Sequence, residues 1–221
     1  MAAARVGSAP RSSDCAKTRL PSSAARSANQ LPVRPCRLVA AQPGAFPYRL
    51  QAVQAYAFLT QLDARAKRYP EAVAASRRGL ELLDGLLRDY PAFRGPQGQW
   101  LQQIRQGLLG AHARGLLGAG SRDEAVRAAG GLDPTLPGWP GGQAYNVGCL
   151  YALLAAGADG SVRDELAGRA MTWLKKAAAG GYPGTPGEVE HVRVQDDDLK
   201  SLRDRPEFRE WAKDLKPAKG K

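Results

Sequence analysis

The residue types that could do chemistry are few and lie far apart along the 221-residue chain. Asp196, Asp197 and Asp198 form the one acidic cluster, which could suggest a hard cation such as Ca²⁺. A calcium loop needs spaced oxygen ligands, a glycine and a distal bidentate glutamate, and this run lacks them. We therefore expect the cluster to cap a helical turn that begins at Leu199, with Arg203 and Arg205 close enough to balance its charge.

The histidines and cysteines do not form a recognisable site either. His191 has no cysteine or second histidine at zinc-ligand spacing, and we expect His112 to be a packed or partly exposed side chain. Cys149 is expected to pack as a small apolar residue, because the sequence shows no His–Asp pair that would activate it. The other cysteines, Cys15 and Cys36, are widely separated, so no disulfide framework is predicted and a reducing, cytoplasmic location is expected. The sequence thus predicts no catalytic, cofactor-binding or metal-binding residue, and no cofactor.

The formal net charge of +11 could suggest nucleic acid as a partner, but most of it lies in one segment. Residues 1–50 hold eight basic residues and one acidic residue, which leaves +4 for the remainder. The segment Gly118–Ser121 lacks the Gly-Lys-Ser/Thr ending of a phosphate loop. Because the four tryptophans never group together, a base-stacking platform is not expected. Nucleic acid is therefore not an expected partner.

Residues 1–46 are rich in Ala, Ser, Arg and Pro and show no apolar period, so we expect a disordered basic tail. Three interpretations of it stay open: a linker or mis-assigned start, an organelle transit peptide, or an electrostatic nucleic-acid arm. The chain has no run of 18 or more apolar residues, so no membrane-spanning helix is expected.

From Leu50 onward, the apolar residues follow a helical period and no segment alternates like a strand. Ser121 and Glu124 have the spacing of a capping box at a helix start. The sequence predicts an all-α domain over residues 47–215, followed by a basic tail at 216–221. The expected helices run over residues 50–68, 70–90, 99–117, 121–129, 144–156, 162–179 and 205–215.

Several turns between these helices resemble the tetratricopeptide repeat, although the spacing is longer than the family period of about 34 residues. The turn at 69–73 (Tyr-Pro-Glu-Ala-Val) is similar to the opening of a repeat's second helix, and the turn at 120–126 looks like it again. Ala72, Ala125 and Ala170 are small residues that would let paired helices approach closely. The resemblance implies stacked antiparallel helix pairs, a degenerate tetratricopeptide-like α-solenoid.

Residues 144–211 closely resemble the C-terminal end of large bacterial serine/threonine protein kinases that carry tetratricopeptide repeats. The segments that carry this resemblance are 144–153, 167–177 and 196–208. The kinase glycine-rich loop, His-Arg-Asp loop and Asp-Phe-Gly motif are absent from the sequence. We therefore expect no kinase activity from this chain.

The expected function is a non-catalytic, tetratricopeptide-like module that binds a protein or peptide segment in a helical groove. The alternative is the detached or truncated C-terminal regulatory part of a bacterial serine/threonine kinase, which a catalytic domain encoded directly upstream would favour. The side chains expected to line the groove are Gln54, Phe58, Gln61, Arg105, His112, Asn146 and Tyr151.

Overall fold

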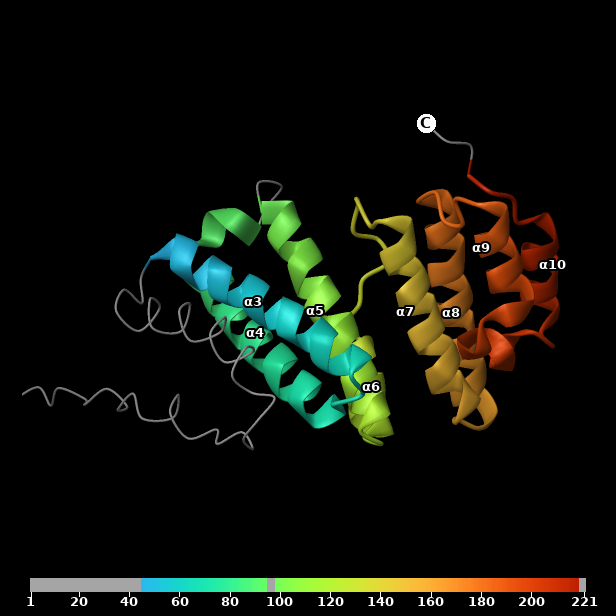
Figure 1. Cartoon of the computed structure of the whole chain (residues 1–221), viewed down its shortest axis with the longest axis horizontal. Helices are drawn as coiled ribbons and strands as arrows, with labels where there is room; N and C mark the ends of the chain where they lie inside the picture. Colours follow the sequence, from blue (N-terminus) through green and yellow to red (C-terminus); the bar gives the residue numbers. More distant parts are fainter. Residues whose placement is uncertain (1–44, 95–97, 219–221) are drawn as a thin grey trace, which may run out of the picture.

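The computed structural model describes residues 45–94 and 98–218, and these residues form an all-α structure without strands. The prediction of an all-α fold built from stacked helix pairs is confirmed (Figure 1). Residues 1–44 of the predicted N-terminal tail lie outside the described residues. The helices are α3 (Phe46–Arg65), α4 (Tyr69–Asp89), η2 (Pro91–Arg94), α5 (Gln99–Gly118), α6 (Arg122–Ala129), α7 (Gly141–Ala156), α8 (Gly160–Ala179), α9 (Pro186–Glu190), η4 (His191–Gln195), η5 (Asp197–Leu202) and α10 (Pro206–Asp214).

The first pair, α3 and α4, begins with proline in both first turns. Helix α3 starts at Phe46, earlier than the expected Leu50, because Pro47 occupies a position whose N–H has no helical partner. It ends at Arg65, and the chain reverses through Lys67, whose φ of 57° is left-handed. The helix therefore ends three residues before the expected end at residue 68.

The second and third pairs are α5 with α6 and α7 with α8. Helix α6 stops at Ala129 because two glycines follow it. Ser121 does precede α6, but the predicted capping box is wrong, since the Ser121 side chain makes no capping hydrogen bond. A capping box occurs instead at α9, between Thr185 and Glu188.

Small residues stand where the helices meet, as the repeat-like turns predict. Ala72, Ala125 and Ala170 are all fully buried. Gly148 of α7 faces Leu174 of α8 so closely that a Cβ on it would lie 2.9 Å from the leucine Cδ2 atom. The pairs are thus held together by close helix–helix approach.

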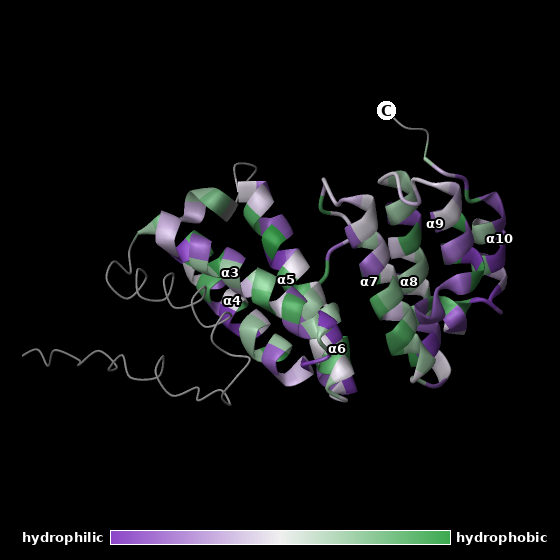
Figure 2. Cartoon of the chain, in the orientation of Figure 1, coloured by the Kyte–Doolittle hydropathy of each residue, from purple (hydrophilic) through white to green (hydrophobic). Residues whose placement is uncertain are grey.

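The pairs follow one another in chain order along the longest axis of the molecule (Figure 1). Helix α5 contacts both α3 and α7, so the first helices of successive pairs are neighbours. Figure 2 shows hydrophobic residues on the visible faces of α7 and α8, whereas α10 is mostly hydrophilic. Among the residues described, no helix is long and apolar enough to cross a membrane.

The buried apolar side chains form two clusters, and α5 contributes to both of them. Leu101 and Leu108 belong to the smaller cluster, which α3 and α4 complete. Ala113 and Leu116, further along the same helix, belong to the larger cluster with α6, α7, α8 and the C-terminal segment. Helix α5 therefore joins the two halves of the apolar interior.

The C-terminal segment covers α7 and was only partly expected. The sequence predicts α10, which is confirmed, and a capped helical turn at Leu199, which lies within the 3₁₀ helix η5; it does not predict α9 or the π-helical turn η4. Helix η5 packs against α7 and buries Leu199 and Leu202 completely. This packing brings the acidic run 196–198 against α7.

Candidate functional site

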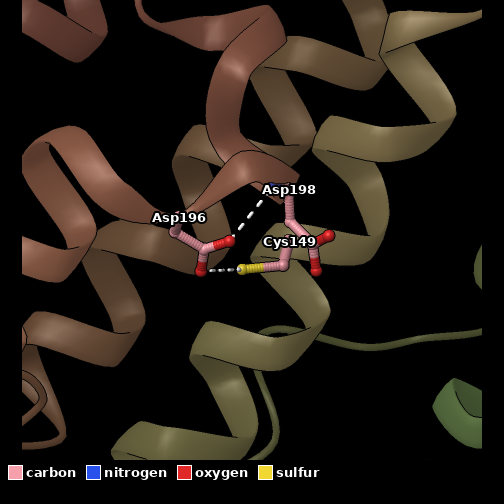
Figure 3. Close-up of side chains that lie close together, drawn as sticks. All are labelled: Cys149, Asp196 and Asp198. Carbon is pink, nitrogen blue, oxygen red and sulfur yellow. Dashed lines mark hydrogen bonds between the residues drawn. The ribbon is translucent and has the colours of Figure 1, made fainter.

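The acidic run meets Cys149 at the junction of α7 and the C-terminal segment (Figure 3). The Cys149 Sγ atom and one carboxylate oxygen each of Asp196 and Asp198 lie within 4.8 Å of one another. Tyr145 stands one helical turn before Cys149 on α7, so both side chains reach the same carboxylate. We call Tyr145, Cys149, His191, Asp196 and Asp198 the junction cluster.

The Asp196 carboxylate is the centre of the junction cluster. The Tyr145 hydroxyl donates to its Oδ2 atom at 2.5 Å, and the Cys149 thiol donates to the same oxygen at 3.7 Å. His191 Nε2 lies 3.4 Å from that oxygen. The other oxygen, Oδ1, accepts the backbone N–H of Asp198 at 2.9 Å, which makes Asp196 the N-cap of η5 (Figure 3). The expectation that the run caps a helical turn is confirmed, with the turn starting before Leu199.

Two arginines tie the junction cluster to its surroundings, and they differ from those expected. Arg114 of α5 pairs with Asp198, with 2.6 Å between Nη2 and Oδ2. Arg203 donates to the backbone carbonyl of Asp196 rather than to a carboxylate, and Arg205 pairs with Asp164. The prediction that Arg203 and Arg205 balance the negative charge of the acidic run is therefore wrong. The cation that pairs with this run is Arg114, on a helix distant in the sequence.

Burial controls the chemistry of the junction cluster. Burial, with the nearby Asp196 charge, raises the pKa of the Cys149 thiol well above its ordinary value. Burial also raises the pKa of Tyr145, and its ring packs against Tyr182 with 4.5 Å between centroids. A protonated thiol is a poor nucleophile and a poor metal ligand. The donors already present occupy the Asp196 oxygens, so this arrangement suits a structural tie between α7 and the C-terminal segment.

A second polar contact, between Ser76 and His112, joins α4 to α5. The Ser76 Oγ atom lies 2.8 Å from His112 Nδ1, the spacing of a nucleophile and its base. Ser76 is fully buried, however, and its Oγ atom also lies 2.8 Å from the Ala72 carbonyl oxygen, its acceptor. Burial, with the positive charge of Arg77, lowers the pKa of His112, so its imidazole is neutral at neutral pH. The expectation that His112 is a packed or partly exposed side chain is confirmed. The contact between Ser76 and His112 stabilises the packing of α4 on α5.

The side chains expected to line a groove do not form one surface. Tyr151 is buried and its hydroxyl donates to the Ala129 carbonyl oxygen at 2.5 Å, so its assignment to a groove is wrong. Its amphipathic side chain fills the core and satisfies the end of α6 at the same time. Arg105 pairs with Asp84 of α4, and Asn146 is exposed on α7.

The three expected residues on α3 do share one face. Gln54, Phe58 and Gln61 are all exposed and follow the spacing i, i+4, i+7. Leu62, which was not among the residues expected to line the groove, extends this face by one position. We call Gln54, Phe58, Gln61 and Leu62 the α3 stripe. Phe58 is 55% exposed and Leu62 is 42% exposed, so the two neighbouring side chains form a small exposed apolar patch.

The arrangement of the described residues thus comprises a structural polar junction and an exposed apolar stripe. Comparisons of the chain with protein-family models, with curated proteins and with solved structures found no match. Inference about function therefore rests on the residues and their geometry.

Proposed function

We propose that the chain is a non-catalytic, tetratricopeptide-like interaction module that binds a peptide segment of another protein. The stacking of helix pairs supports this proposal, because α3, α5 and α7 lie side by side as first helices of successive pairs. Arrays of this kind bind partners across the exposed faces of such helices.

The α3 stripe is the observation that carries the proposal. Phe58 and Leu62 lie one helical turn apart and keep about half of their surface in water. Fully burying a side chain of this size contributes about 1.5–3 kcal/mol, so covering the remaining half of each contributes on the order of 1 kcal/mol. Gln54 and Gln61 flank the two apolar side chains with amide groups that can hydrogen-bond a peptide backbone.

The polar clusters support a role without catalysis. Cys149 holds its proton, and Ser76 is fully buried where a substrate cannot reach it. Cys149 is also a buried free thiol, which suits the reducing cytoplasm that we propose as the location of the protein. These groups serve packing, whereas the α3 stripe is a surface open to a partner.

A displayed library of random peptides, selected on the full chain, tests the proposal. We expect recovered peptides to bind the wild-type chain and to lose at least tenfold in affinity for the double variant Phe58→Ser, Leu62→Ser. The matched control is Val162→Ser on α8, because Val162 is 52% exposed but lies outside the stripe. Circular dichroism establishes that each variant is folded. Equal binding by the wild type and the double variant would exclude the α3 stripe as the site.

A further inference from the structure

A pocket of about 310 Å³ lies between η4, the end of η5 and α10. Cationic side chains make up most of the lining of this pocket, and none of its described lining residues is acidic. Its lining consists of Arg193, Arg203, Phe208, Arg209, Ala212 and Lys213.

The positive charges of the three arginines are held in place without being neutralised. Arg193 donates to three carbonyl oxygens at the end of α10, at 2.7 to 3.0 Å. Arg203 donates to the carbonyl oxygen of Asp196, and Arg209 donates to that of Asp204, both at 2.7 Å. Carbonyl oxygens orient a guanidinium group but carry no net charge. The pocket therefore keeps an excess of positive charge.

Arg203 also carries an unmet hydrogen-bond donor. Its Nε atom is buried and, within the described part of the chain, has no hydrogen-bond partner. A buried N–H without an acceptor costs about 1–3 kcal/mol, more when the group is charged.

The charges of α10 are sorted between two faces. Arg209 and Lys213 are four residues apart, so they share the face that lines the pocket. The acidic residues of this helix, Glu207, Glu210 and Asp214, follow the spacing i, i+3, i+7 and fall on the other face. This separation keeps the carboxylates of α10 out of the pocket.

We propose that this pocket binds the phosphomonoester group of a small soluble ligand. The planar guanidinium fork matches the geometry of phosphate oxygens, and an ion pair formed with phosphate is strong where water is partly excluded. The volume is at the lower end of the range for small-molecule sites, about 300–1,000 Å³. This binding is independent of the peptide binding proposed for the α3 stripe.

Titration calorimetry of the full chain with phenyl phosphate tests the proposal. We expect saturable binding, and at least a tenfold loss of affinity in the double variant Arg209→Gln, Lys213→Gln. Both of these side chains are exposed, so the variant should fold. The matched control is Lys175→Gln, which removes an exposed cation from α8 and should leave the affinity unchanged.

Three results would overturn the proposal. The first is the absence of saturable binding of phenyl phosphate. The second is an equal loss in the Lys175→Gln control, which would show attraction to overall charge only. The third is binding to phosphatidylcholine vesicles that contain phosphatidate without binding of phenyl phosphate, which would assign the phosphomonoester to a lipid surface instead of a soluble ligand.

Discussion

Two adjacent glycines at the start of α7 offer a matched test of how closely the helices pack. A Cβ added to Gly141 would lie 2.8 Å from the carbonyl oxygen of Gly180 and 2.9 Å from that of Ala177. A Cβ added to Gly142 would meet no atom within 4 Å. The two positions share a helix and a helical turn, so they differ mainly in what surrounds them.

The expected effect of Gly141→Ala is a loss of about 1–3 kcal/mol in the free energy of unfolding, the usual cost of overpacking. The atoms that would clash belong to the backbone at the end of α8, so they cannot rotate away. Restoring ordinary contact requires the two helices to separate by roughly 0.5 Å. Gly142→Ala should instead be neutral or stabilise by up to about 1 kcal/mol, because alanine restricts the unfolded chain more than glycine does.

Thermal and urea denaturation, followed by far-ultraviolet circular dichroism, measure this difference. A difference of about 2 kcal/mol corresponds to roughly 4–8 °C in Tm for a domain of this size. Equal midpoints for Gly141→Ala and Gly142→Ala would refute the close approach of α7 and α8 at this point.

Three further predictions concern the junction and the core. Val147→Asp buries an unpaired charge in α7 and should cost about 3 kcal/mol or more; unchanged thermal unfolding would mean that Val147 does not face the core. The pKa of Cys149 is raised in the folded state, so the thiol's contribution to the free energy of unfolding is full below the ordinary thiol pKa and falls as the pH rises above about 8.5. The variant Cys149→Ala should therefore lose less stability at high pH than the wild type, as measured by urea denaturation at successive pH values. A double-mutant cycle of Arg114→Gln and Asp198→Asn should give a coupling of about 0.5–1 kcal/mol that declines with salt, and zero coupling at low salt would show that the ion pair contributes nothing.

The helices of the pairs could be predicted because their signals are local. Glycine and proline mark the helix ends, and the apolar period of 3.6 residues marks the faces, so α4 and α10 agree with the prediction within a residue or two. The segment 186–202 lacks such a period and folds into short turns that only its packing on α7 stabilises. Local pattern predicted only the turn that the acidic run caps, and not α9 or η4.

The junction cluster shows a second limit. That Asp196 would cap a turn follows from neighbouring residues, but its contacts with Tyr145 and Cys149 depend on how η5 packs against α7. The pairing of Arg114 with Asp198 joins residues 84 positions apart, and no sequence spacing indicates it. Tyr151 was misassigned for a related reason, because a tyrosine on a first helix can line a groove or fill the core. The hydrogen bond from its hydroxyl to the Ala129 carbonyl oxygen, which stabilises the buried position, cannot be seen in the sequence.

The division of the apolar interior along α5 has a consequence for cooperativity. Since α5 carries buried residues of both clusters, and Val73 of α4 also packs against the larger one, the two halves of the molecule are coupled through α5 and the start of α4. Between Leu108 and Ala113 the helix includes Gly110, so the span that transmits the coupling contains a weak helix former. Amide hydrogen exchange should therefore report two units of different local stability that meet within α5. The stability of α5 around Gly110 then determines whether the chain unfolds in one step or two.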